Sequence, residues 1–141
     1  MIWKHQPSLE QLNQTNQASL PEHLGMEFTE IGEDYLMAKM PVDQRTIQPF
    51  GILHGGATAA LAETMGSVAA MYCIEDPSQY MPVGIELNIN HLRSARSGFV
   101  YGRVTAIKTG RQIQVWNIEI KNEENKLISV SRLTIAIVER S

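Results

Sequence analysis

The chain has 141 residues, of which 43% are hydrophobic and 19% charged, so it is long and apolar enough to fold as one domain with its own core. The net charge of −3 disfavours the broad basic face that nucleic acid binding needs. No stretch approaches the roughly 18 apolar residues of a membrane span, and the N-terminus lacks the apolar region of a signal peptide. The only cysteine, Cys73, has no disulfide partner in the chain. We therefore expect one cytoplasmic domain over residues 1–141, with neither a membrane nor a nucleic acid as partner.

Two short helices are predicted at the start of the chain. Ser8 followed by Gln11 three residues later is a capping-box pattern, which predicts a helix through about Asn16. The run at residues 20–25 predicts a second helical turn, which begins at a proline and ends at a glycine. Two strands, at residues 26–31 and 35–42, follow and are joined by a hairpin turn.

The longest predicted helix runs from residue 56 to about residue 73, after a loop at 43–53 that contains Pro49 and Gly51 as breakers. Four strands are expected beyond it, at residues 83–89, 99–107, 113–120 and 127–138. The first of these places four apolar side chains on one face: Val83, Ile85, Leu87 and Ile89. Because strands and helices do not alternate along the chain, the order predicts an α+β fold in which a largely antiparallel sheet wraps around one long helix.

The start of this helix has the features of a site for negative charge. The backbone amides of Gly55 and Gly56 lack partners within the helix, and the helix dipole is positive at this end. They are suited to an oxygen that carries negative charge, such as the oxyanion of acyl transfer. His54 and Gln48 bring side-chain donors to the same corner. The alternative is that the glycine pair only starts a helix.

Glu63 is the acid that such a site would use. It lies on one stripe of the helix with Ala59 and Ser67, and a carboxylate among small residues is costly to bury without a function. Gly55 is about 12 Å away along the axis at 1.5 Å per residue, whereas a reacting carbon must lie about 3 Å from both the oxyanion donor and the nucleophile. One helix therefore cannot supply both groups. The alternatives are an exposed helix carboxylate at Glu63 and an ordinary core serine at Ser67.

Two copies packed antiparallel about a two-fold axis resolve this distance. Glu63 of one copy would then face Gln48, His54 and Gly55 of the other. We expect small residues on the helix to let the two copies approach closely: Ala59, Ala60 and Gly66. The geometry thus predicts at least a dimer.

Basic residues are concentrated in the second half of the chain. No acid occurs between Glu86 and Glu119, yet five of the 12 basic residues fall there: Arg93, Arg96, Arg103, Lys108 and Arg111. A local positive field on an acidic protein indicates a small anionic ligand. The alternative is a solvated strand face whose cations pair with acids elsewhere.

Several ordered motifs resemble the hot dog fold acyl-CoA thioesterases of the phenylacetate-thioesterase branch. They are residues 1–4, 37–43, 45–46, 48–51, 53–56, 60–64, 66–67, 83–88, His91, Arg93 and 110–111. The likeness covers essentially the whole chain. It implies the hot dog fold and hydrolysis of acyl-CoA thioesters, with no metal and no cofactor, because CoA is part of the substrate.

The resemblance also implies roles for single residues. Glu63 would be the nucleophile or general base, and the Gly55 amide would polarise the thioester carbonyl. Gln48 and His54 would hold that carbonyl or the leaving thiol, and Ser67 would position the carboxylate or water. The family's CoA contacts map onto Gly84, His91, Leu92, Arg93 and Ser94, and onto the loop Lys108, Thr109, Gly110, Arg111, Gln112 and Ile113.

The substrate and partners are expected on the same basis. The acyl pocket would be lined by Phe50, Val68 and Met71 together with residues across the interface. The resemblance favours aromatic acyl groups, such as 1,4-dihydroxy-2-naphthoyl in menaquinone biosynthesis, and a homotetramer. An acyl or aryl carrier protein is a further possible partner. The remaining alternatives are a hydratase or dehydratase of acyl thioesters and a non-catalytic acyl-CoA-binding or protein-interaction module.

Overall fold

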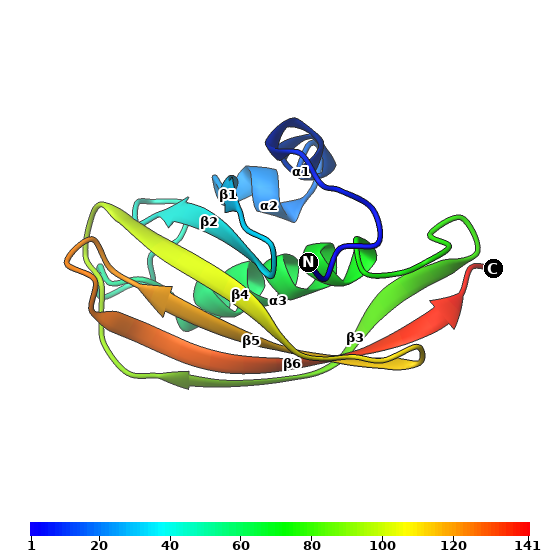
Figure 1. Cartoon of the computed structure of the whole chain (residues 1–141). Helices are drawn as coiled ribbons and strands as arrows, with labels where there is room; N and C mark the ends of the chain where they lie inside the picture. Colours follow the sequence, from blue (N-terminus) through cyan, green and yellow to red (C-terminus); the bar gives the residue numbers. More distant parts are fainter.

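The structure, a computed structural model, describes all 141 residues. A six-stranded sheet curves around one long helix, and two short helices precede it (Figure 1). In chain order the elements are α1 (Leu9–Thr15), α2 (Leu20–His23), β1 (Glu27–Ile31), β2 (Tyr35–Pro41), α3 (Gly55–Met71), β3 (Tyr80–His91), β4 (Phe99–Thr109), β5 (Ile113–Lys121) and β6 (Leu127–Glu139). No helix has both the length and the apolar character needed to cross a bilayer.

The predicted elements are all present, with small shifts at their ends. The predicted cap of α1 is formed, because Ser8 Oγ accepts a hydrogen bond of 3.2 Å from the Gln11 amide. Helix α3 begins one residue earlier than predicted, at Gly55, and ends two residues earlier, at Met71. Strand β3 is longer than predicted, since its pairing with β6 continues from Tyr80 to His91.

The sheet has the strand order β1-β2-β4-β5-β6-β3, and every neighbouring pair is antiparallel. Strand β3 is the edge strand at the side of the sheet opposite β1, and it pairs with β6 alone. Its second side therefore carries no strand within this chain. This open edge lies beside α3, which contacts β3 as well as the strands further in.

Helix α3 lies in the hollow of the curved sheet and supplies the middle of the core (Figure 1). Its residues Leu61, Ala62 and Met65 are fully buried against the sheet. The prediction that Gly66 faces a second helix was wrong. A Cβ on Gly66 would lie 2.4 Å from Leu133 Cδ2, so this glycine faces β6 and lets α3 approach the sheet.

A β-bulge changes the faces of β3. Gly84 is paired with Ile135 and Glu86 with Thr134, so Ile85 is the extra residue between them. The predicted common face of Val83, Ile85, Leu87 and Ile89 was therefore wrong. Because the bulge shifts the side-chain alternation by one, Gly84 comes onto the same inward face as Leu87 while Ile85 is 57% exposed.

Candidate functional site

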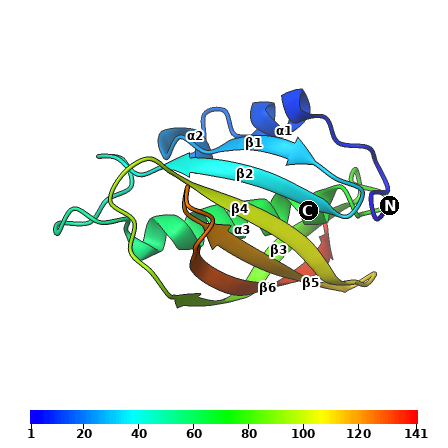
Figure 2. The same ribbon diagram turned by 60° about the vertical axis from the view of Figure 1, so that its left-hand side comes forward.

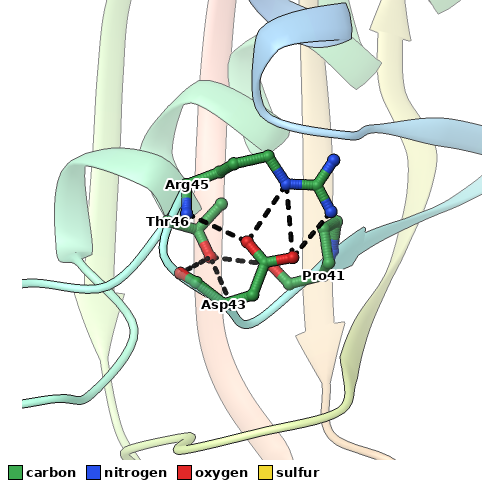
Figure 3. A network of polar contacts seen from close by, with 4 residues as sticks. All are labelled: Pro41, Asp43, Arg45 and Thr46. Carbon is green, nitrogen blue, oxygen red and sulfur yellow. Dashed lines mark hydrogen bonds and ion pairs between the residues drawn. The ribbon is translucent and has the colours of Figure 1, made fainter.

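A polar turn after β2 holds the chain that leads to α3 (Figure 3). Arg45 pairs with Asp43 through Nη2 and Oδ2 at 2.6 Å, and this hydrogen-bonded guanidinium lowers the pKa of Asp43. Thr46 is buried: its hydroxyl donates to the Pro41 carbonyl at 2.7 Å and accepts from the Asp43 amide at 3.2 Å. The Thr46 carbonyl then accepts from the His54 amide at 2.8 Å. The turn thus fixes the residue directly before α3.

A small hairpin stands between this turn and the helix. Ile47 and Leu53 form an antiparallel bridge, and Gly51 at the tip has a φ of +81°, a value that favours glycine. The hairpin projects away from the sheet and from α3 (Figure 2). Phe50 at its tip is 85% exposed.

The first turn of α3 leaves one amide free. His54 is the N-cap: its Nδ1 accepts from the Gly56 amide at 2.7 Å, and its carbonyl accepts from the amides of Ala57 and Thr58. The Gly55 amide has no partner in the chain. The prediction that Gly55 and Gly56 both offer free amides was therefore half right, because the cap occupies Gly56.

Two side chains that precede α3 also keep free donors. Gln48 Oε1 accepts a hydrogen bond from the Phe50 amide, so the NH2 group of Gln48 is free. Because His54 Nδ1 is an acceptor, the proton of the neutral ring is on Nε2. Gln48, His54 and Gly55 thus each keep one donor that has no partner within the chain. That arrangement is suited to an oxygen with negative charge.

Glu63 lies on the exposed side of α3 and takes part in neither of the chain's two ion pairs. Its carboxylate rests against β3, since a Cβ on Gly84 would be 2.7 Å from Glu63 Oε2. Ser67 follows one helical turn later and is half-buried, and no hydrogen bond links its side chain to Glu63.

The donors and the acid are not brought together within one chain. Gly55 and Glu63 lie about 12 Å apart along the axis of α3, which is further than a glutamate side chain reaches. The expected acyl pocket is divided in the same way. Val68 and Met71 are half-buried on α3, whereas Phe50 lies beyond the other end of the helix.

The predicted CoA contacts fall at two ends of the molecule. His91 lies at the start of α3, where its Nε2 would be 3.1 Å from a Cβ on Gly55. Leu92, Arg93 and Ser94 follow it and are exposed. At the other end of α3, Thr109, Gly110, Arg111 and Gln112 line a cavity of about 670 Å³ with Cys73, Tyr80 and Gln114, while Lys108 and Ile113 flank it on the strands.

The predicted local positive field is therefore not one patch. Arg93 and Arg96 precede β4, and Lys108 and Arg111 lie at its far end, a strand length away. Arg103 stacks on the Tyr35 ring, with its Cζ 4.0 Å from the centroid. The segment between Glu86 and Glu119 has no acid, but its basic side chains lie at three separate places: before β4, within β4 and at the far end of β4.

One contact of the site was missed by sequence reasoning. Gly84 was expected only as a CoA contact, yet it is the residue on which the Glu63 carboxylate rests. A glycine inside a strand indicates a bulge or a close approach, and that signal was present in the sequence.

Comparison with known proteins identifies the family. The family described as the Thioesterase superfamily matches residues 50–129, which include the hairpin tip, all of α3, strands β3 to β5 and the start of β6. The chain belongs to the thioesterase superfamily. A crystal structure of a thioesterase from Haemophilus influenzae superposes with a TM-score of 0.94 at 52% identity, covering 99% of this chain and 96% of that one. This thioesterase therefore has the hot dog fold and is an enzyme that hydrolyses thioesters.

Two similar proteins have more specific names. The 1,4-dihydroxy-2-naphthoyl-CoA hydrolase of Escherichia coli is 49% identical over 138 residues, which are 98% of this thioesterase and 100% of the relative. The proofreading thioesterase EntH of Cronobacter turicensis is 47% identical, over 98% of this chain and 99% of that one.

Two variants of a Staphylococcus aureus thioesterase have also been solved. One has a glutamate replaced by alanine and the other a glutamine, and the two positions are 15 residues apart. Both structures are 38% identical to this chain, with TM-scores of 0.82 and 0.80; they cover 85% and 83% of it, and it covers 98% and 96% of them.

Proposed function

We propose that this thioesterase hydrolyses acyl-CoA thioesters at a site shared between two copies of the chain. Glu63 of one copy acts as nucleophile or general base. The Gly55 amide of the other copy binds the carbonyl oxygen, and Gln48 and His54 beside it hold that oxygen or the leaving thiol. Ser67 positions the carboxylate or the attacking water.

The observation that carries this proposal is the complementary chemistry of two separated groups. The start of α3 offers three free donors, and Glu63 offers only acceptors and has no ion-pair partner. Separately, neither group can polarise and attack a thioester. The replaced glutamine and glutamate of the Staphylococcus aureus protein have the same 15-residue separation as Gln48 and Glu63 here, which supports the same pairing.

The chemistry follows from these groups. In one route Glu63 removes a proton from a water molecule while that water attacks the thioester carbon. In the other route Glu63 itself attacks the carbon and forms a mixed anhydride, which water then hydrolyses. In either route the negative charge that develops on the carbonyl oxygen is stabilised by the Gly55 amide. The carbon–sulfur bond then breaks, and the thiolate of CoA leaves and takes a proton.

A two-fold dimer through the open edge of β3 would assemble such a site. The side of α3 that faces away from the sheet carries small residues beside Glu63, among them Ala59, Ala60 and Ser67, which are only half-buried in one chain. An antiparallel partner helix there would bring the partner's Gly55 end toward Glu63. Pairing of two such dimers into a homotetramer is part of the same proposal, from the resemblance.

We propose aromatic acyl groups as substrates, with 1,4-dihydroxy-2-naphthoyl-CoA as the first candidate. The 49% identity to the Escherichia coli hydrolase of that compound supports this choice. Phe50 of one copy would meet Val68 and Met71 of the other around the ring. Such a substrate would place the enzyme in menaquinone biosynthesis. The CoA moiety would contact Gly84, the segment from His91 to Ser94, and the loop from Lys108 to Ile113.

The second candidate function is proofreading of aryl groups on a carrier protein, which the likeness to EntH favours. The same aryl group, offered either on CoA or on a phosphopantetheinyl carrier protein, distinguishes the two. A higher kcat/KM on the carrier would select the second function.

The test of the proposed chemistry is Glu63→Gln, assayed by thiol release over a panel of aryl and fatty acyl-CoAs. We expect kcat to fall by about 10²–10⁴-fold, because a positioned carboxylate contributes that much to proton transfer. Binding of CoA, measured by calorimetry, should be retained. A variant that keeps the wild-type rate would reject the proposal. Single turnover in H₂¹⁸O identifies an anhydride that water opens at the Glu63 carbonyl, since only that route leaves label in Glu63.

A further inference from the structure

The carboxylate of Glu63 occupies the place that a side chain on Gly84 would take. A Cβ on Gly84 would lie 2.7 Å from Glu63 Oε2, closer than real Cβ contacts come. The next obstacle, Leu133 Cδ1, would be at an ordinary 3.6 Å. The missing side chain of Gly84 therefore makes room for the carboxylate and for little else.

The β-bulge at Ile85 creates this contact. Without the extra residue, Gly84 would face away from α3, because side chains alternate along a strand. The bulge turns Gly84 inward, opposite Ile135, and leaves Ile85 on the open edge. The strand is thus irregular at the point where the helix presents its only acid.

We propose that Gly84 is a positioning residue for Glu63 and that it sets where the carboxylate lies relative to the scissile thioester. This inference rests on the proposed function, in which Glu63 carries the reaction. Gly84 and the bulge at Ile85 form a surface without a side chain, and the carboxylate end of the flexible Glu63 side chain packs against it. A side chain at position 84 would displace the carboxylate and leave the fold in place.

The role of Gly84 is separable from backbone conformation and core packing. Its φ is outside the left-handed range found at Gly25, Gly51 and Gly98, so alanine fits the backbone. The atom in the way is the end of a flexible glutamate. Gly102 makes a matched control. It is a strand glycine that also faces α3, but a Cβ there would be 2.4 Å from Met65 Sδ, away from the carboxylate.

The first measurement compares Gly84→Ala with Gly102→Ala for melting temperature, kcat and KM. We expect Gly84→Ala to melt no lower than the wild type, since alanine is less costly than glycine to order in a strand. Its kcat should fall by about 10²-fold, the effect of a displacement near 1 Å, with a much smaller change in KM. Gly102→Ala should lose melting temperature and keep its kcat. Equal losses of kcat in both variants, or a Gly84→Ala enzyme of normal kcat, would overturn the proposal.

The second measurement is a double-mutant cycle with Glu63→Asp, which shortens the acid by one methylene and removes the conflict at position 84. We expect Gly84→Ala to have little further effect on kcat in this background, so the two changes are not additive. If Gly84→Ala slows Glu63→Asp as much as it slows the wild type, Gly84 does not act through Glu63. That result would leave the proposed function standing, whereas a fully active Glu63→Gln enzyme would reject both.

Discussion

At the scale of single residues, His54 determines which backbone amide at the start of α3 stays free. His54 satisfies the amides of Gly56, Ala57 and Thr58 through its ring and its carbonyl, and this leaves the Gly55 amide as the free one. The capping atom of His54 is an acceptor, so the same residue keeps its Nε2 proton for another molecule. One side chain thereby serves both the helix and the proposed site.

This selection predicts the effect of Gly55→Pro. Proline is favoured at the first helical position, and the extended His54 before it, with ψ at 129°, is compatible with a following proline. The variant therefore removes the amide hydrogen and keeps the helix. We expect kcat to fall by about 10²–10³-fold, as for loss of one oxyanion donor.

The control for this change is Gly55→Ala, which keeps the amide but adds a Cβ 3.1 Å from His91 Nε2. Circular dichroism should show the same helix content in both variants. If the two lose the same activity, crowding of His91 explains the loss, and the amide is not used.

Much of the residue scale could be read from the sequence. Residue type and spacing indicate Glu63 and the residues at the start of α3 as candidates, and the family match supports the reaction class. The capping of Gly56 by His54 could not be read, because it depends on a ring rotamer. The contact of Glu63 with Gly84 was hidden for a related reason: one bulged residue decides which face a glycine takes.

At the scale of elements, the turn at 43–46 and the hairpin at 47–53 behave as one arm that starts α3. The hydroxyl of Thr46 closes the turn, and its carbonyl holds His54. Composition predicts a loop here, since proline and glycine interrupt it. The bridge between Ile47 and Leu53 and the internal hydrogen bonds are tertiary details that a loop assignment cannot contain.

The arm predicts a cost for Thr46→Val, which keeps the shape of the side chain. The buried Pro41 carbonyl and the half-buried Asp43 amide would both lose their partner, so we expect about 1–3 kcal/mol of lost stability in urea unfolding. Arg45→Gln is the matched comparison, because it breaks only the exposed ion pair to Asp43, and such pairs contribute little. A Thr46→Val protein as stable as Arg45→Gln would show that the hydroxyl does not hold the turn.

At the scale of the whole molecule, the proposed dimer builds each site from groups of two chains. The sequence predicted the strand order along the chain and a sheet around one helix, because periodicity and breakers report these directly. It could not predict that the basic residues between Glu86 and Glu119 would lie at both ends of β4, since residue composition does not say where each side chain lies in space. The distance between Gly55 and Glu63 follows from helix geometry alone, and the proposal of a second copy rests on that distance.

Shared sites predict recovery of activity on mixing two inactive enzymes. Glu63→Gln and Gly55→Pro chains, coexpressed in equal amounts, should form mixed dimers in which one site has both native groups and the other has neither. With random pairing we expect about one quarter of the wild-type rate per chain, since half of the dimers are mixed and each has one intact site of two. Tagged chains of both kinds allow the mixed dimer to be purified and assayed. Activity no greater than the sum of the two variants would place each site within a single chain.

The buried sulfur of Cys73 has a practical consequence. It is the only cysteine of the chain, and burial raises its pKa to about 11. A thiolate is the form that attacks a disulfide reagent. At neutral pH we therefore expect such a reagent to react with released CoA and not with Cys73 of the native protein. Once the chain is denatured, the same sulfur becomes accessible. The reagent used to follow turnover then also measures the amount of unfolded protein.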